Sequence, residues 1–104
     1  FKIEPDQQWN LIQKLHPTPA VSGFPRDKAL TCISNFEPHE RELYAGIIGF
    51  KSTERTQLYV NLRSARIDAT KIYLFVGGGL TQKSVPQDEW LETENKSKTI
   101  AKFL

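Results

Sequence analysis

The stretch that most constrains the fold of this chain runs from Pro86 to Lys96, and it has the pattern of a helix start. Ser84 is followed three residues later by Gln87, the spacing of a capping box that satisfies free backbone N–H groups. Pro86 fits the first turn, where a missing N–H removes no helical hydrogen bond. The sequence therefore predicts a final helix that begins near Pro86 and continues toward the end of the chain.

One face of this predicted helix is unusual, because charged side chains occupy the stripe that should point inward. At roughly 100° per residue, Glu89, Glu92 and Lys96 fall on the same side of the helix. The same stripe continues into the apolar residues Ile100, Phe103 and Leu104. The opposite face is polar and carries Glu94, Asn95, Lys98 and Lys102. We therefore expect two carboxylates and an ammonium group at the head of an inward-facing stripe.

Two interpretations of Glu89 and Glu92 follow from their spacing. Carboxylates three residues apart repel each other unless a cation lies between them, and hard oxygen ligands suit Mg²⁺. In the other interpretation the two acids complement the helix dipole, and Glu92 forms a surface ion pair with Lys96. Spacing alone favours the second interpretation, and the first stays open.

Composition places the chain among ordinary globular proteins. Its 104 residues suffice for one domain with a modest core, and its 38% hydrophobic and 25% charged residues are typical values. No apolar run approaches transmembrane length and no signal peptide is visible, so we expect no membrane partner. The net charge of +2 comes from scattered Lys and Arg, which argues against a nucleic-acid partner.

Cysteine and methionine usage adds further expectations. Cys32 is the single cysteine, which excludes an internal disulfide and a cysteine metal site and predicts a reducing, cytoplasmic location. Cys32 falls in a predicted amphipathic helix, where we expect a buried structural thiol. The chain contains no methionine and begins at Phe1 without an entry signal, so we expect it to be a piece of a longer polypeptide whose N-terminal portion is missing.

The first part of the chain predicts two helices separated by a rigid loop. The first helix covers residues 5–15, with Asp6 as a plausible cap, and it ends where Pro17 and Pro19 force extended backbone. The loop from residue 16 to residue 25 is almost free of charge, so we expect it to lie against the core or a ligand. The second helix covers residues 25–36 with an inward face of Ala29, Leu30, Cys32 and Ile33.

The middle of the chain predicts three strands, at residues 43–50, 57–66 and 71–76. Short connections between consecutive strands favour an antiparallel meander. The second strand alternates Leu58, Val60 and Leu62 with Tyr59, Asn61 and Arg63, and we expect the final helix to pack on the leucine and valine face or at the sheet end. The predicted fold class is therefore α+β, with two helices, a three-stranded antiparallel meander and a C-terminal helix.

Two features of these strands have both a structural and a functional interpretation. Arg63 is either an ordinary solvent-facing strand residue or a fixed fork for a carboxylate. The run Gly77-Gly78-Gly79 lacks the lysine and spacing of a phosphate loop, although its exposed backbone amides could still cradle an anion.

Five motifs follow one another along the chain. They are His16 to Pro25, Arg41 with Tyr44-Ala45-Gly46, Arg63-Ser64-Ala65, Gly77-Gly78-Gly79, and Glu89-Trp90-Leu91-Glu92-Thr93 with Lys96. In this order they resemble the C-terminal quarter of the chorismate-utilising enzymes, and within them isochorismate synthase most closely. The resemblance covers the chain from about His16 to its end. It predicts that residues 1–104 are the C-terminal part of a chorismate-binding domain, cut from the larger fold of that family. Gly78 and Leu80 stand where the family commonly has alanine and isoleucine.

The resemblance implies an activity and a role for individual residues. The activity is the Mg²⁺-dependent conversion of chorismate to isochorismate, for menaquinone or siderophore synthesis, with water adding at carbon 2 and the carbon 4 hydroxyl leaving. Glu92 matches a Mg²⁺ ligand and Glu89 a second one, direct or through water. The positions matching substrate contacts are Tyr44, Arg63, Gly77, Gly79 and Lys96, together with His16, Thr18, Ala20 and Val21 on the pocket wall.

The resemblance also implies what lies elsewhere. The base that activates water, the acid that protonates the leaving hydroxyl and a further metal-binding glutamate would all precede this segment, so we expect the segment alone to be inactive. The alternatives are a salicylate synthase, an anthranilate or aminodeoxychorismate synthase component, or a non-catalytic binding module on the same scaffold. The anthranilate-type enzymes usually have threonine after the strand arginine, where this chain has Ser64.

Overall fold

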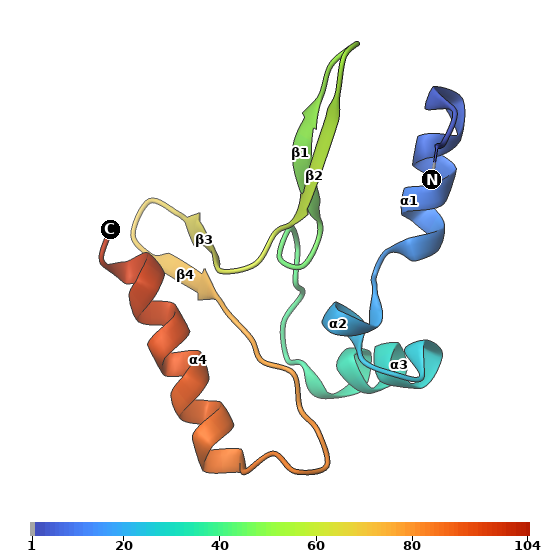
Figure 1. Cartoon of the computed structure of the whole chain (residues 1–104). Helices are drawn as coiled ribbons and strands as arrows, with labels where there is room; N and C mark the ends of the chain where they lie inside the picture. Colours follow the sequence, from blue (N-terminus) through green and yellow to red (C-terminus); the bar gives the residue numbers. More distant parts are fainter. Residues whose placement is uncertain (1) are drawn as a thin grey trace. The chain divides into compact units, whose positions relative to one another are not determined.

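The structure, a computed structural model, describes residues 2–104 and divides into two compact units, residues 1–38 and 39–104 (Figure 1). The first unit is helical and the second combines two β-hairpins with a long helix, which confirms the predicted α+β class. The first unit contains η1 (Pro5–Gln7), α1 (Gln8–Leu15), α2 (Pro19–Ser22) and α3 (Arg26–Phe36). The second contains β1 (Ile47–Lys51), β2 (Thr56–Val60), β3 (Ser64–Ile67), β4 (Ile72–Phe75) and α4 (Pro86–Ala101).

The first predicted helix is confirmed, with a single 3-10 turn, η1, leading into α1. Its start differs from the prediction, since Asp6 lies inside the first turn and Glu4 holds the cap position without a side-chain hydrogen bond. Its end is fixed from outside the helix. The Arg26 guanidinium donates to the Lys14 carbonyl at 3.1 Å and to the His16 carbonyl at 2.8 Å. These bonds satisfy carbonyls that a helix end leaves free.

The segment between the two helices is not a plain loop, because it contains the short helix α2. Pro19 occupies the first helical position, where proline is favoured rather than disruptive. The Ser22 side chain is buried, and its hydroxyl donates to the Thr18 carbonyl at 3.1 Å. Gly23, at φ +93°, then ends the turn in a conformation that other residues rarely adopt.

The second predicted helix is confirmed as α3. Ala29, Leu30 and Ile33 are half-buried, as the helical spacing predicts. Cys32 is exposed, so the expectation of a buried thiol is wrong. The reason is geometric: Cys32 lies one residue before Ile33, and adjacent residues on a helix point about 100° apart.

The second unit contains two separate antiparallel hairpins where one three-stranded meander was predicted. In the first, β1 pairs with β2 from Ile47 opposite Val60 to Lys51 opposite Thr56. In the second, β3 pairs with β4 from Ser64 opposite Phe75 to Ile67 opposite Ile72. The division falls at Arg63, whose φ of +56° interrupts the extended backbone that was predicted to continue through residues 57–66.

A turn replaces the beginning of the first predicted strand. Glu42 and Ala45 both have positive φ, at 51° and 63°, so the backbone from Arg41 to Gly46 coils before β1 begins. Asn61 fastens this turn. Its backbone N–H donates to the Gly46 carbonyl, its carbonyl accepts from the Ala45 N–H, and its side-chain amide donates to the Leu43 carbonyl at 2.9 Å.

The final helix, α4, begins at Pro86 as predicted, but the capping box does not form. The Ser84 hydroxyl instead accepts a hydrogen bond from the Thr81 backbone N–H at 3.0 Å. The helix ends at Ala101, so Phe103 and Leu104 lie beyond it. It packs against β4 rather than on the Leu58 face of β2 (Figure 1). Within residues 2–104, no helix is both long and apolar enough to cross a membrane.

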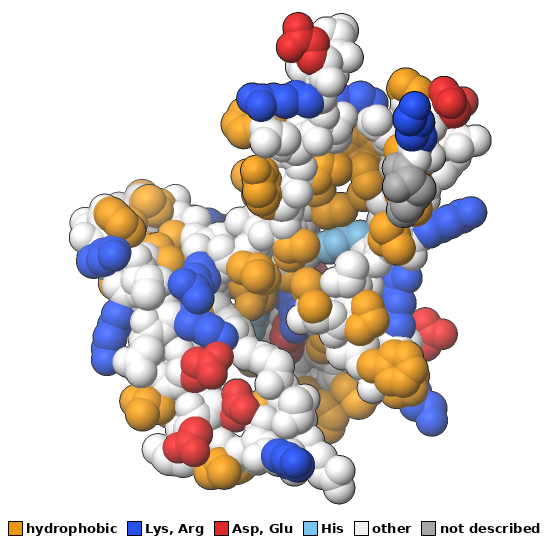
Figure 2. All heavy atoms as spheres, viewed as in Figure 1, with side chains coloured by type: hydrophobic (Ala, Val, Ile, Leu, Met, Phe, Trp, Pro, Cys, Tyr) orange, Lys and Arg blue, Asp and Glu red, His pale blue; other side chains and the backbone are white. Residues whose placement is uncertain are grey.

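Burial is much lower than the modest core that composition predicts. Among residues 2–104 only Ala45 and Ser22 are buried rather than half-buried or exposed. Hydrophobic side chains lie on the visible surface of both units (Figure 2). Large exposed residues include Phe24 and Phe36 in the first unit and Phe50, Leu80, Trp90 and Phe103 in the second. Short helices and two-stranded hairpins have few faces to pack against one another, so most apolar side chains stay uncovered.

Candidate functional site

The charged stripe of α4 faces the glycine segment that follows β4. A methyl group placed on Gly78 would lie 3.5 Å from Glu89 Oε2, 3.9 Å from Glu92 Oε1 and 3.9 Å from Lys96 Nζ. Both carboxylates and the ammonium group therefore surround a single point above Gly78. The structure brings together all three residues of the predicted stripe, and a methyl group at Gly78 would meet only ordinary contacts.

Lys96 links the helix to the glycine segment. Its ammonium group donates to the Gly77 carbonyl at 3.0 Å and forms an ion pair with Glu92 one helical turn earlier. The Glu92 side chain is 55% exposed, whereas that of Lys96 is 23% exposed. The hydrogen bond and the charge of Lys96 lower the pKa of Glu92. Burial opposes them, and the charge of Arg63 adds a smaller lowering effect. Glu92 is thus held as a carboxylate with two cations near it.

This lowered pKa gives a first prediction, in which Lys96→Gln raises the pH at which Glu92 titrates. Because the folded-state pKa lies below the unfolded value, the pair stabilises the fold at neutral pH. That contribution is lost as pH falls through the lowered pKa. The measurement is the carboxyl carbon shift of Glu92 followed by NMR during acid titration. A midpoint for Glu92 that does not move in Lys96→Gln would show that Lys96 does not set its ionisation.

Tyr44 lies on the other side of the glycine segment. A methyl group on Gly77 would approach the Tyr44 hydroxyl to 2.6 Å, which is closer than such contacts occur, so only glycine fits there without movement. The Tyr44 ring stacks against Phe75 with centroids 6.1 Å apart, and the Arg41 guanidinium lies 5.8 Å from its centre. The phenol hydroxyl is therefore placed at the same backbone segment that Lys96 reaches from α4.

Arg63 completes the arrangement, although it does not sit in the middle of a strand as predicted. It lies between the two hairpins in the left-handed backbone conformation, and its positive charge helps to lower the pKa of Glu92. Arg63 and Glu92 both border an open hollow of about 450 Å³, a volume within the range of small-molecule sites. The residues that line this hollow are Arg63, Asp88, Leu91, Glu92, Asn95, Lys96 and Thr99.

Four of these lining residues were not predicted from the sequence, namely Asp88, Leu91, Asn95 and Thr99. Asn95 was assigned to the opposite, polar face of the helix, where its side chain accepts a hydrogen bond from Lys98 at 3.3 Å, and it also borders the hollow. Their helical spacing could have identified them, because residues 88, 91, 92, 95, 96 and 99 follow one another at intervals that place them on one side of a helix. A broader stripe than the one drawn through Glu89, Glu92 and Lys96 would have included them.

The Glu89 and Glu92 carboxylates have some of the properties of a divalent-cation site. Glu89 and Glu92 offer hard oxygen donors within 4 Å of one point above Gly78, which suits Mg²⁺. Throughout residues 2–104, no three His, Cys, Asp or Glu side chains gather closely enough to hold a metal ion. The two glutamates therefore fit part of a Mg²⁺ ligand set, to which water or a substrate carboxylate would add the remaining oxygens.

The remaining predicted positions lie elsewhere. A methyl group placed on Gly79 would meet no atom within 4 Å, so the backbone there is open to a ligand. His16, Thr18, Ala20 and Val21 belong to the first unit, where Ala20 and Val21 lie in α2 and the carbonyls of His16 and Thr18 accept the Arg26 and Ser22 hydrogen bonds. These hydrogen bonds involve backbone carbonyls and not the side chains, so the role of the four residues in binding a substrate stays a prediction.

A family model described as chorismate binding enzyme matches residues 4–104, which is nearly the whole chain. This chain belongs to the chorismate-binding enzyme family. The matched range includes the five ordered motifs, the glycine segment and the charged stripe of α4.

Several curated proteins that are similar to this chain are isochorismate synthases. Isochorismate synthase MenF of Escherichia coli is 40% identical over 93 residues, covering 89% of this chain and 22% of the relative. Isochorismate synthase EntC of E. coli is 41% identical over 87 residues, covering 83% and 22%. Isochorismate synthase MenF of Bacillus subtilis is 39% identical over 97 residues, covering 92% and 21%. The chain spans about a fifth of the length of these relatives.

Proposed function

We propose that residues 1–104 supply a substrate-binding and Mg²⁺-binding part of an isochorismate synthase, which converts chorismate to isochorismate. The observation that carries this proposal is the convergence of Glu89, Glu92 and Lys96 on Gly78, with Tyr44 against the neighbouring Gly77. Similarity to isochorismate synthases from two bacterial species supports the reaction. The product would enter menaquinone or siderophore synthesis, the two uses that the resemblance implies.

Each charged group has a distinct task in this proposal. Chorismate carries two carboxylates, and a site for a dianion needs fixed donors and cations. Arg63 and Tyr44 bind one carboxylate, which we assign to the enolpyruvyl arm. The exposed amides at Gly77 and Gly79 add neutral donors. Lys96 stays near the substrate while its bond to the Gly77 carbonyl holds the glycine segment against α4.

Glu89 and Glu92 are the residues that would hold Mg²⁺. When bound, this ion neutralises the ring carboxylate and fixes its orientation. The Lys96 ion pair keeps Glu92 deprotonated, as an oxygen ligand must be. The proton transfers at carbons 2 and 4 are assigned to groups outside residues 1–104, because the family resemblance implies that the base and the acid precede this segment.

The test is a chimera in which residues 1–104 replace the matching segment of E. coli isochorismate synthase MenF. Conversion of chorismate to isochorismate with Mg²⁺, followed by chromatography, is the expected result. Salicylate or anthranilate as the product would point to one of the related activities instead. A folded chimera that binds chorismate without converting it would favour the non-catalytic binding module.

A second prediction is that residues 1–104 alone form no isochorismate from chorismate and Mg²⁺. The physical reason is that the base and the acid, which the resemblance implies lie outside these residues, typically contribute about 10²–10⁴-fold each. The measurement is product formation by chromatography against a buffer control, with the chimera as the positive control. Product above the buffer level from residues 1–104 alone would mean that the proton-transfer groups are within them.

A further inference from the structure

The turn that carries Tyr44 is bent in an unfavourable way and must be held in place. Glu42 and Ala45 both occupy the left-handed region, at φ 51° and 63°, on either side of Leu43 and Tyr44. Residues other than glycine seldom adopt this conformation, and they persist in it only when their surroundings impose it. Asn61 fixes the Leu43 to Gly46 end of the turn through three hydrogen bonds. The Glu42 end is closed by the Tyr44 N–H, which donates to the Arg41 carbonyl at 2.8 Å.

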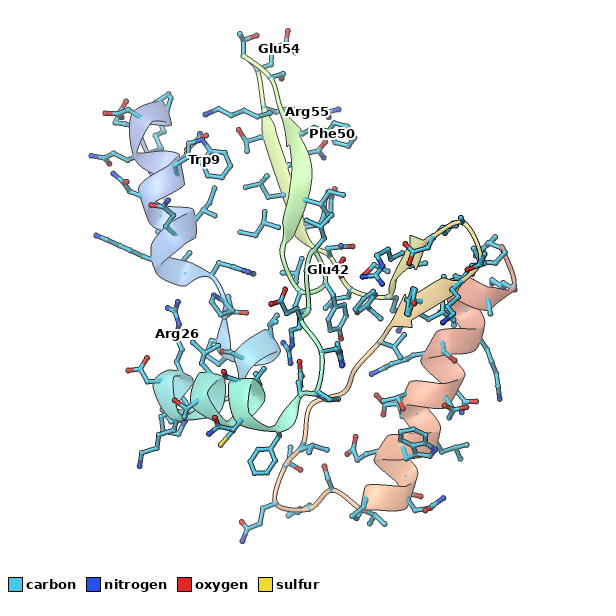
Figure 3. All side chains as sticks on the ribbon, turned by 180° about the vertical axis from the view of Figure 1, so that it is seen from behind. Trp9, Arg26, Glu42, Phe50, Glu54 and Arg55 are labelled. Atoms are coloured by element: carbon cyan, nitrogen blue, oxygen red, sulfur yellow. The ribbon has the colours of Figure 1, made fainter. Side chains whose placement is uncertain are left out.

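Arg66 adds a side-chain restraint at this end from the second hairpin. Its guanidinium forms an ion pair with the Glu42 carboxylate, across 24 positions of sequence. Figure 3 shows Glu42 on the turn that precedes β1, at the opposite end of the β1–β2 hairpin from Glu54. The ion pair therefore ties the strained turn to β3.

Arg66 is itself ordered by two further partners. Its guanidinium lies 4.3 Å from the centre of the Tyr73 ring, on the cross-strand neighbour in β4, and its Nε lies 3.5 Å from Asp68 Oδ1. Burial alone would lower the pKa of Arg66, but the Glu42 and Asp68 carboxylates outweigh it and raise the pKa. Exposed ion pairs usually contribute little to stability, because both side chains lose conformational freedom when they pair. Here Tyr73 and Asp68 already restrict the arginine, so pairing with Glu42 costs it less freedom.

We propose that Arg66 is a positioning residue that, through Glu42, holds the Arg41–Gly46 turn so that the Tyr44 hydroxyl stays at Gly77. The proposal deepens the proposed function and rests on it for its consequence in catalysis. Arg66 and Glu42 do not touch the substrate. They fix the position of Tyr44, and the Tyr44 hydroxyl binds the substrate carboxylate. Loss of the pair should therefore weaken chorismate binding more than it slows turnover.

The kinetic test uses the chimera described above. Glu42→Gln and Arg66→Gln should each raise KM for chorismate roughly two- to tenfold, the scale of one hydrogen bond, with a smaller change in kcat. In a Tyr44→Phe background, Glu42→Gln should add little, because the hydroxyl that it positions is gone. Glu54→Gln, an exposed glutamate at the hairpin tip in Figure 3, is the matched control with unchanged KM. An unchanged KM in Glu42→Gln, or an equal increase in the Tyr44→Phe background, would overturn the proposal.

A second measurement does not depend on activity. Residues 1–104 are prepared with 3-fluorotyrosine at position 44, and the ¹⁹F resonance is compared with that of an unstructured peptide. The Phe75 ring beside Tyr44 should displace the resonance in the unaltered chain. The displacement should shrink in Glu42→Gln and Arg66→Gln but not in Glu54→Gln. If the chimera is inactive but these shifts appear, the proposed function fails and the positioning role stands. Equal shifts in all four proteins would exclude the positioning role.

Discussion

Glu92→Gln in the chimera is expected to lower kcat by about 10²–10³-fold while leaving the fold intact. Gln keeps the size of the side chain but removes the negative charge that Mg²⁺ requires of its ligand. It also leaves Lys96 without its ion-pair partner. Because Glu92 is more than half exposed, this loss of pairing has little effect on folding. The effect should therefore appear in turnover and not in thermal stability.

The companion substitution separates the two interpretations of the charged stripe. Glu89→Gln should be milder than Glu92→Gln if its contact with Mg²⁺ runs through water. If both acids merely complement the dipole of α4, neither substitution changes turnover. Glu94→Gln, an exposed glutamate of the same helix, is the control. Activity measured across a Mg²⁺ titration decides the question, and identical metal dependence in the unaltered and Glu92→Gln chimeras would leave only the surface-helix interpretation.

Local patterns were enough to predict most elements and the helix face that carries the charged stripe. Pro86 marked the start of α4, the prolines at 17 and 19 ended α1, and the period of the stripe placed Glu89, Glu92 and Lys96 on one face. These predictions depend on interactions within a few residues, which the sequence contains directly. The point above Gly78 confirms that the three side chains converge.

The features that could not be predicted depend on unusual backbone conformations. Glu42, Ala45 and Arg63 all adopt positive φ, and none is a glycine whose presence would have indicated it. These three residues replace the start of one strand by a turn and divide another between two hairpins. The contact between Glu42 and Arg66 follows from that rearrangement, so no spacing rule could have identified it.

Low burial has a similar origin. The alternation of Leu58, Val60 and Leu62 predicts an apolar face, with the final helix on that face or at the sheet end. The structure has α4 on β4, and Leu62 stays 55% exposed. Periodicity shows that a face is apolar, but it does not say which element covers it. The hollow beside Arg63 was missed for the same reason, because Asn95 and Thr99 are polar residues that join a site only through the position of the helix.

Arg63→Lys is expected to reduce kcat/KM of the chimera by roughly 10- to 100-fold, about 1.5–3 kcal/mol of transition-state stabilisation. Lysine keeps the positive charge but loses the planar fork that binds a carboxylate through two parallel hydrogen bonds. Neither residue is a glycine, so the left-handed backbone at position 63 is no more strained by lysine than by arginine. The substitution therefore tests the fork separately from the fold.

The charge of Arg63 gives this experiment an internal control. Because Arg63 helps to lower the pKa of Glu92 through its charge, lysine at this position should leave the acid titration of Glu92 nearly unchanged. Arg55→Lys, at the exposed hairpin tip, controls for general effects of the exchange. A fall in kcat/KM with an unmoved Glu92 titration assigns the loss to the lost hydrogen-bond geometry. Unchanged kcat and KM in Arg63→Lys would remove Arg63 from the substrate site, and the carboxylate would then have to be bound by Tyr44 and the glycine amides.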